Sequence, residues 1–211
     1  MPVFFSFDGI DGGGKSTQLK LFCQWLAEQG HDPIVCRDPG STAVGEQIRN
    51  ILLDSDDSTS IAPRSEMLLY MAARAQLVDE IIKPALEAGQ TVVSDRYLLA
   101  NIVYQGYGGG LPVEMVHKVG NIAIDGVTPD CTFLLDLEPA AALARMGRKL
   151  DRVESRGAAY RERLRAGFLA EAAATPGKIH VIAADRPVDV IQDEIQLIAS
   201  KELKKQQISG L

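Results

Sequence analysis

Short apolar runs alternate along the chain with longer segments in which apolar residues recur every three or four positions. The short runs predict strands at residues 3–7, 33–37, 91–94, 132–137 and 179–183. Their near-continuous apolar character is typical of strands that are buried on both faces of a parallel sheet. The pattern therefore predicts a buried parallel sheet of five strands.

The longer segments predict helices near residues 15–29, 43–53, 64–88, 97–105, 112–124, 139–147, 157–173 and 187–205. In the last of these, Val188, Ile191, Ile195 and Ile198 form one apolar stripe, as expected for an amphipathic helix. Five strands that alternate with helices predict an α/β fold with a doubly wound parallel sheet, within one domain over residues 1–211. Ligands of such sheets bind at the carboxyl ends of the strands, here after residues 7, 37, 94 and 137.

Composition narrows the class of protein. The 211 residues are 46% hydrophobic and 24% charged, as in an ordinary globular protein with one core. A formal net charge of −6 argues against a general nucleic-acid binder, and no apolar run approaches the roughly 20 residues of a membrane span. The three widely spaced cysteines resemble neither a disulfide scaffold nor a zinc site, and no secretory signal is evident. We therefore expect a cytoplasmic protein.

The segment after the first predicted strand reads GIDGGGKS and fits the pattern G-x-x-x-x-G-K-[ST] at every position. Glycines let successive backbone N–H groups surround phosphate oxygens, and the N-terminus of the next helix favours an anion. Lys15 is expected to reach the terminal phosphates, and the Ser16 hydroxyl to ligate Mg²⁺. We expect this phosphate loop to bind ATP through Gly9, Ile10, Asp11, Gly12, Gly13, Gly14, Lys15, Ser16 and Thr17.

The second and third strands also end in polar residues. After the second, Pro39 and Gly40 force a tight turn, in which Asp38 either faces a ligand or lies in a solvated loop. The third strand ends at Asp95, a usual position for an acid that assists Mg²⁺ beside a phosphate loop. Arg96 follows, and its planar guanidinium suits phosphate oxygens.

Two helical segments carry weaker signals. Tyr70 and Arg74 share one helix face, and from the pattern alone a core helix with an exposed arginine fits slightly better than a ligand site. Asn101 and Gln105 are also four residues apart, with Tyr104 beside them. Side-chain amides can recognise a base edge, but they are equally common on wet helix faces.

A cationic segment follows the fourth strand. It holds four basic residues within eight positions, namely Arg145, Arg148, Lys149 and Arg152. Such a run is usually a solvated loop. In a phosphoryl-transfer enzyme it is instead expected to be a mobile lid, at about residues 145–155, whose arginines neutralise the transferring group.

Taken in order, the motifs resemble those of the thymidylate kinase family over about residues 3–195. They are FDGIDGGGKST at 7–17, RDPGST at 37–42, ARAQ at 73–76, DRY at 95–97, YQG at 104–106, PD at 129–130 and DRVE at 151–154. The resemblance implies a P-loop fold of the nucleoside monophosphate kinase type with a short lid. It also implies Mg²⁺-dependent transfer of the ATP γ-phosphate to dTMP by a homodimer, with no nucleic-acid or membrane partner.

The resemblance implies a role for each matching residue. Catalytic roles fall on Lys15, Asp11, Arg96, Arg148 and Arg152, metal binding on Ser16 and Asp95, and a place near adenine on Arg145. The acceptor nucleotide is expected at Asp11, Asp38, Pro39, Tyr70, Arg74, Arg96, Asn101, Tyr104 and Gln105. Within that set Asp38 would face the deoxyribose 3′-hydroxyl, Tyr70 would stack on thymine and Arg96 would bind the acceptor phosphate.

The chain also departs from the family pattern. Asp8 and Asp38 each stand where the family usually has glutamate, and Ser41 stands where it usually has glycine. Some members carry an arginine within the phosphate loop, where this chain has Gly12, so the cationic segment indicates the bacterial-like type with lid arginines.

Other functions stay open at this stage. A deoxynucleoside kinase or a kinase for another monophosphate shares most of these features. A non-catalytic nucleotide-binding module is a further alternative, although it would be expected to lose Lys15, Asp95 or Arg96, which are all present.

Overall fold

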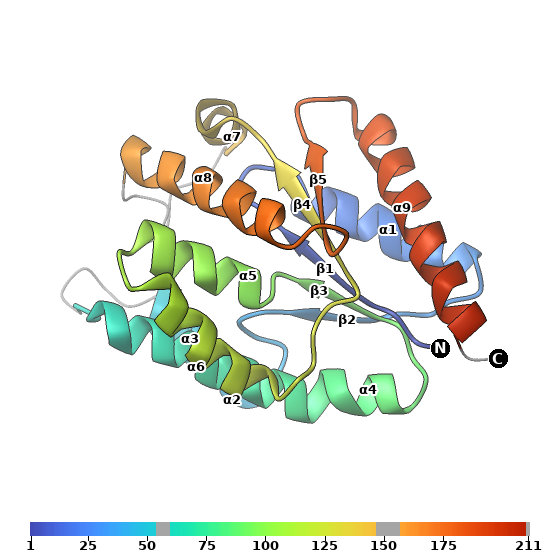
Figure 1. The fold of residues 1–211 in the computed structure, drawn as a ribbon, viewed down its shortest axis with the longest axis horizontal. Coiled ribbons are helices and arrows are strands. Elements are labelled where there is room, and N and C mark those ends of the chain that lie inside the picture. The colour runs from blue at the N-terminus through green and yellow to red at the C-terminus, as the bar shows by residue number, and fades with distance from the viewer. Residues whose placement is uncertain (54–59, 147–156, 210–211) are drawn as a thin grey trace.

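A computed structural model of the chain describes residues 1–53, 60–146 and 157–209. Its centre is a parallel five-stranded sheet in the order β2-β3-β1-β4-β5 (Figure 1). The strands are β1 (Phe4–Asp8), β2 (Ile34–Arg37), β3 (Val92–Asp95), β4 (Cys131–Asp136) and β5 (Ile179–Ala183). Each predicted strand is confirmed to within one residue at either end, and the doubly wound α/β fold is confirmed with them.

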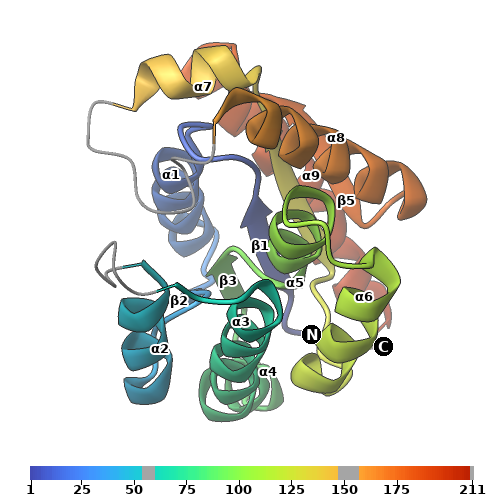
Figure 2. The same cartoon turned by 90° about the vertical axis from the view of Figure 1, so that its left-hand side faces the viewer.

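Helices cover both faces of this sheet. They are α1 (Lys15–Glu28), α2 (Ala43–Leu53), α3 (Pro63–Leu77), α4 (Lys83–Glu87), α5 (Leu98–Asn101), α6 (Val113–Ile124), α7 (Pro139–Arg145), α8 (Ala158–Ala174) and α9 (Val188–Ser209). Helices α1 and α9 pack together on one face, and α3, α5 and α8 lie on the other (Figures 1 and 2). Among the described residues, no helix is long and apolar enough to cross a membrane.

Two predicted helices are not continuous α-helices. The predicted helix 64–88 consists of α3, a π-helical segment η1 (Val78–Ile82) and α4, and the predicted helix 97–105 passes from α5 into a second π segment, η2 (Ile102–Gly108). In η2 the hydroxyl of Tyr104 reaches the phosphate loop, whereas the side chain of Gln105 reaches α3. The wider turn of η2 thus directs two adjacent side chains to different elements, as π segments near functional sites often do.

A cluster of aromatic rings fixes the helix that begins at the phosphate loop. The ring of Phe22 in α1 lies 5.1 Å from Phe5, 5.5 Å from Phe7 and 5.4 Å from Phe133 between centroids. All four rings are fully buried. Burial of each such side chain contributes about 1.5–3 kcal/mol, so this cluster holds α1 firmly against β1 and β4. Its rigidity fixes the position of Lys15 at the start of α1.

Candidate active site

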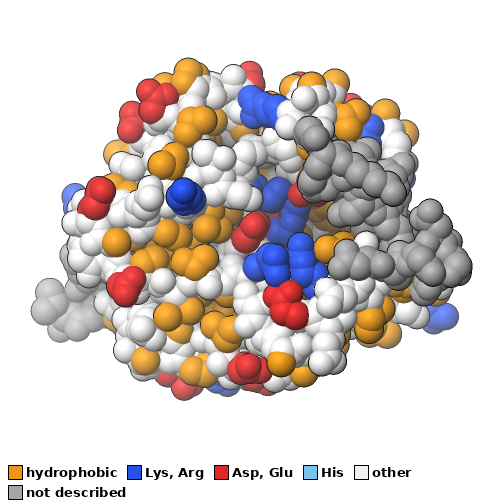
Figure 3. Space-filling model, turned by 180° about the vertical axis from the view of Figure 1, so that it is seen from behind, with side chains coloured by type: hydrophobic (Ala, Val, Ile, Leu, Met, Phe, Trp, Pro, Cys, Tyr) orange, Lys and Arg blue, Asp and Glu red, His pale blue; other side chains and the backbone are white. Residues whose placement is uncertain are grey.

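The carboxyl ends of the strands meet at one edge of the sheet, where they border a cavity of about 830 Å³. Basic side chains gather in this hollow, although the chain as a whole is acidic (Figure 3). The cavity is lined by residues 11–18 of the phosphate loop and α1 and by Arg37, Asp38, Arg49, Asp95, Arg96, Arg145, Met146, Ala184, Arg186, Val188 and Ile191. Local cationic charge of this kind suits a polyanionic ligand.

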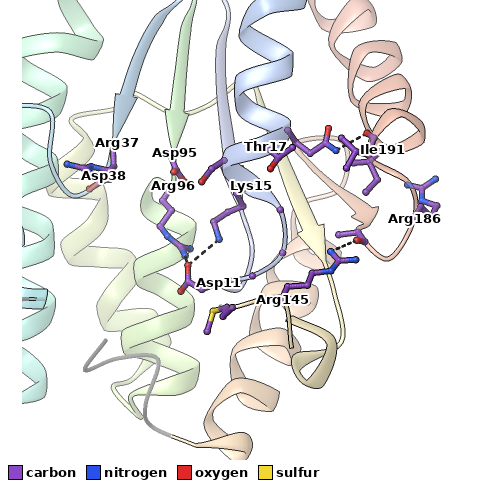
Figure 4. A pocket seen from close by; sticks show the side chains of 18 of the residues that line it. Asp11, Lys15, Thr17, Arg37, Asp38, Asp95, Arg96, Arg145, Arg186 and Ile191 are labelled. Carbon is purple, nitrogen blue, oxygen red and sulfur yellow. Dashed lines mark hydrogen bonds and ion pairs between the residues drawn. The ribbon is translucent and has the colours of Figure 1, made fainter. Parts of the chain in front are cut away.

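The phosphate loop has a backbone that only glycine fits. Gly9 and Gly12 have φ angles of +129° and +81°. A Cβ atom at Gly9 would lie 2.5 Å from the carbonyl oxygen of Leu135, and one at Gly12 would lie 2.2 Å from that of Ala142. The loop is therefore pressed against β4 and α7, and it leads directly into the N-terminus of α1 at the cavity (Figure 4). A helix N-terminus in this setting favours phosphate.

Lys15 is folded back onto its own loop. Its Nζ donates to the carbonyl oxygens of Gly9 and Ile10 at 3.0 Å each and to Asp11 Oδ1 at 3.4 Å. Burial and the neighbouring charge of Arg96 lower the pKa of Lys15 below its usual value. The ammonium group is held by acceptors that a phosphate can replace.

Three side-chain donors contact the carboxylate of Asp11. Arg96 pairs with its Oδ1 and Lys15 contacts the same oxygen (Figure 4). Tyr104 donates to Oδ2 at 3.0 Å. Burial alone would raise the pKa of Asp11, but Arg96 and Lys15 outweigh it and hold that pKa well below its usual range. Arg96 also donates to the Gly9 carbonyl at 3.0 Å. The structure thus brings the predicted residues Lys15, Asp11, Arg96 and Tyr104 together.

Asp38 and Arg74 form a buried ion pair between the turn after β2 and α3. Arg74 Nε donates to Asp38 Oδ2 at 2.6 Å, and both side chains are at most 1% exposed. The prediction from the pattern alone of an exposed arginine is therefore wrong, because Asp38 compensates the charge of Arg74. Burial raises the pKa of Asp38 although Arg74 opposes the shift. Asp38 Oδ1 has no hydrogen-bond partner within the described ranges, so it is available to a ligand.

The rest of the turn after β2 is held by its own contacts. Arg37 Nη2 lies 2.9 and 3.0 Å from the two carboxylate oxygens of Glu46. Ser41 has a φ of +66°, a conformation that favours glycine, which accounts for the glycine usual at this position. Its hydroxyl accepts a hydrogen bond from the Arg37 N–H at 2.8 Å, which offsets part of the strain. The carbonyl of Pro39 accepts from Arg49 at 3.0 Å.

The predicted base-binding residues differ in burial and in what they contact. Tyr70 is half-buried and packs against a small cluster of Ile48, Leu52 and Ala73. Asn101 and Gln105 are buried and joined by a hydrogen bond of 2.6 Å. The interpretation of this amide pair as a wet surface feature is therefore wrong.

Two predicted oxygen ligands for a metal line the same cavity. Ser16 is exposed at the first turn of α1, and Asp95 is half-buried at the end of β3. Asp95 Oδ1 is buried and has no hydrogen-bond partner among the described residues. Those residues contain no group of three or more His, Cys, Asp or Glu side chains that could enclose a metal by themselves.

One end of the cavity includes a residue that the sequence did not indicate. Arg145, which was predicted to lie near adenine, lines the cavity here, and its guanidinium donates to the Ala184 carbonyl at 2.9 Å (Figure 4). Arg186 lies nearby, after β5. Inspection of the fifth strand end, which the carboxyl-end rule covers equally, would have found it. The predicted lid residues Arg148 and Arg152 lie outside the described residues.

Three further polar residues of the site were missed. Arg49 on α2 lines the cavity, and Glu66 on α3 is buried beside Gln105. Asp8 is fully buried at the end of β1, where Ser6 donates to its Oδ2 at 3.1 Å. Burial raises the pKa of Asp8 to about 7, against the charges of Arg96 and Lys15. A glutamate usually stands at position 8, but no local pattern gives the chemistry of a buried acid there.

Comparisons with known proteins agree on one family. The sequence profile described as thymidylate kinase matches residues 7–195. A thymidylate kinase from Exiguobacterium sp. is 47% identical over 195 residues, which are 92% of each chain. One from Symbiobacterium thermophilum is 41% identical over 206 residues, covering 97% of this chain and 96% of the relative. The crystal structure of thymidylate kinase from Ehrlichia chaffeensis is similar, with a TM-score of 0.77, 30% identity and coverage of 94% and 98% of the two chains.

The burial of Asp8 predicts an unusual pH dependence of stability. Its folded pKa of about 7 exceeds the ordinary value of 3.8, so the folded state binds more protons than the unfolded state between these values. The contribution of Asp8 to the free energy of unfolding is therefore largest at low pH and decreases as the pH rises towards 7. Relative to Asp8→Asn, wild type should lose roughly 2 kcal/mol of unfolding free energy between pH 5 and pH 8, measured by urea denaturation.

The exposed Asp32 provides the control, because Asp32→Asn makes the same chemical change on the surface. A difference between wild type and Asp8→Asn that stays constant from pH 5 to pH 8 would contradict the prediction.

Proposed function

The chain belongs to the thymidylate kinase family, and we propose from this premise how its cavity carries out the transfer. It is a phosphotransferase that moves the γ-phosphate of ATP to dTMP and gives dTDP. Our proposal concerns the residues. The phosphate loop holds the donor, and the space between the ends of β2 and β3, α3, α5 and η2 holds the acceptor.

One observation carries this assignment. Lys15 from the phosphate loop and Arg96 from the end of β3 approach the same oxygen of Asp11. A cation suited to the donor phosphates and one suited to the acceptor phosphate are thus separated by a single carboxylate. Two nucleotides that each bind one of these cations would meet end to end, as in-line transfer requires.

The residues work mainly by charge and position. An incoming triphosphate would displace the carbonyls of Gly9 and Ile10 from Lys15, and an acceptor phosphate would occupy the donors of Arg96. Asp11 stays ionised because its cationic neighbours hold its pKa low, so it orients these groups and takes no proton. The acceptor phosphate is already anionic at neutral pH, and the reaction needs neutralisation of charge more than a general base.

On the acceptor side, Asp38 Oδ1, which has no partner in the described part of the chain, is suited to a deoxyribose hydroxyl. Arg74 fixes the other oxygen of this carboxylate, which limits how far the shorter acid can move. Tyr70, Arg74, Asn101 and Gln105 would surround the base. On the donor side, Arg145 and Arg186 border the end of the cavity away from Arg96 and would contact the adenosine part of ATP.

The residues present fit a magnesium ion. Mg²⁺ usually binds through one or two protein oxygens together with substrate phosphates and water. The Oδ1 of Asp95, which has no hydrogen-bond partner among the residues that the structure describes, and the exposed hydroxyl of Ser16 offer that kind of set. When bound, the ion would neutralise charge on the donor phosphates.

We further propose that Arg148 and Arg152 supply cations from a lid at about residues 145–155. The reason is local to the phosphate loop, where Gly12 leaves no room for a side chain that could act in their place. The three cysteines are free, which agrees with a cytoplasmic location.

A homodimer is proposed through the surface of α2, α3 and α6. Helix α3 packs between α2 and α6 (Figure 2). Three large apolar side chains on these helices are exposed, Ile51 at 48%, Leu68 at 53% and Ile122 at 80%. A second copy of the chain would cover them.

The reaction itself is tested with a panel of acceptors. With ATP and Mg²⁺, the purified protein should phosphorylate dTMP with a higher kcat/KM than dUMP, UMP, AMP, GMP or thymidine, measured by coupled release of ADP. Lys15→Ala serves as the inactive control, because it removes the donor-phosphate cation. A preference for thymidine would identify a nucleoside kinase instead, and a preference for another monophosphate would exclude dTMP as the substrate.

The lid assignment is tested separately. Arg148→Ala or Arg152→Ala should lower kcat by about 10³-fold if one of them stabilises charge on the transferring phosphate. Lys149→Ala, which removes a cation from the same segment, should have a much smaller effect. Normal kcat in both arginine variants would refute the assignment.

The dimer is tested by sedimentation equilibrium. Leu68→Glu should convert a dimer into a monomer, because it places a charge in the proposed apolar contact. Leu197→Glu on α9 is the matched control, since Leu197 is 60% exposed on the opposite side of the sheet. A monomeric wild-type protein, or a Leu68→Glu variant that remains dimeric, would rule out this interface.

A further inference from the structure

Three buried polar side chains form a hydrogen-bonded chain between two helical elements. Gln105 Nε2 in η2 donates to Glu66 Oε1 in α3 at 3.1 Å. Asn101 Nδ2 in α5 donates to Gln105 Oε1 at 2.6 Å. The three residues are only 2–3% exposed, so solvent does not compete for these contacts.

The carboxylate at one end determines the direction of every bond in this chain. Glu66 accepts this bond in the structure, and a carboxylate offers only acceptors when it is ionised, so Gln105 presents its NH₂ group to Glu66. Its oxygen then faces Asn101, which must in turn present its own NH₂ group to Gln105. The oxygen of Asn101 is left at the far end, and Oδ1 is buried without a hydrogen-bond partner within the described ranges.

Both ends of this hydrogen-bonded series belong to elements that also carry residues assigned above to the acceptor site. Glu66, Tyr70 and Arg74 are spaced four residues apart and therefore share one face of α3. Next to Gln105, Tyr104 contacts Asp11 of the phosphate loop. The three side chains are thus carried by the same elements, α3 and the helix of α5 and η2, as the residues assigned above to the base and to the acceptor phosphate.

We propose that Glu66 is a positioning residue that makes Asn101 present an acceptor, and not a donor, to the base. This inference rests on the proposed acceptor site. An acceptor matches the ring N3–H of thymine or uracil. Cytosine has a lone pair at that nitrogen, and two lone pairs facing each other would be repelled and left unsatisfied. Glu66 therefore contributes to selection of the base although it does not touch it.

A purely structural role makes a different prediction. If Glu66 only braces α3 against η2, a side chain of the same shape that still hydrogen-bonds to Gln105 should preserve function. Glu66→Gln is such a side chain. It offers Gln105 either an oxygen or an NH₂ group, so the hydrogen bond between α3 and η2 remains. The donor and acceptor directions of the bonds from Glu66 to Asn101 are then no longer fixed.

The test compares kcat/KM for dTMP, dUMP and dCMP, with ATP as donor. In Glu66→Gln the ratio of dTMP to dCMP should fall by about tenfold or more, because Asn101 can then present its NH₂ group. The ratio of dTMP to dUMP should stay unchanged, since both bases carry the N3–H, and the KM for ATP should stay unchanged as well. A dTMP to dCMP ratio within twofold of wild type in the folded variant would overturn the proposal.

Glu80→Gln is the matched control. Glu80 also accepts from a glutamine amide, that of Gln76 at 2.8 Å, but at an exposed position of η1. The same chemical change there should leave all three acceptors unaffected.

A second comparison shows whether Glu66 acts through Asn101. In an Asn101→Ala background, Glu66→Gln should cause no further change in the dTMP to dCMP ratio. An equal change in both backgrounds would overturn the proposed route. If Glu66→Gln fails to fold, as judged by circular dichroism, Glu66→Met repeats the test, because it removes the acceptor that orients Gln105 and keeps a side chain of similar length.

The outcomes separate this inference from the proposed function. A wild-type protein that does not phosphorylate dTMP would overturn both. A wild type that does so, with a base preference insensitive to Glu66, would overturn the inference alone.

Discussion

The site depends on the ion pairs that Asp11 makes with Lys15 and Arg96. Without an anion between them, these two cations would repel each other, and burial together with the charge of Arg96 already lowers the pKa of Lys15. The carboxylate of Asp11 compensates both and keeps them close together. Contacts within the protein tie the phosphate loop, the end of β3 and η2 to this one side chain. Such preorganisation is what electrostatic catalysis requires.

Several buried acceptors at the site lack partners within the described part of the chain. They include oxygens of Asp8, Asp38, Asp95 and Asn101, and three of these residues are among those expected from the sequence to contact ligands. A buried acceptor without a partner costs about 1–3 kcal/mol. This cost is concentrated where substrates and a metal would satisfy it. The site thus gives up some stability of the protein in favour of ligand binding.

The sequence predicted those parts of the structure that local patterns determine. The strands were found because apolar runs are short and well bounded, and the phosphate loop because its glycines and Lys15 are adjacent along the chain. The pairing of Asp38 with Arg74 was not found, since these residues are 36 positions apart and only the fold brings them together. For the same reason the burial of Glu66 beside Gln105 had no local signal. The π segments were missed because their composition does not differ from that of an α-helix.

The close approach of α7 to Gly12 also limits how this kinase can change over time. A side chain at position 12 would collide with the Ala142 carbonyl and would require a backbone conformation that favours glycine. An arginine in the loop, as some relatives of the family carry, is therefore out of reach of a single substitution. Helix α7 would first have to move away from the phosphate loop, and that movement alone would bring no catalytic gain. The position of one carbonyl oxygen thus keeps a side chain out of this part of the phosphate loop in the present backbone.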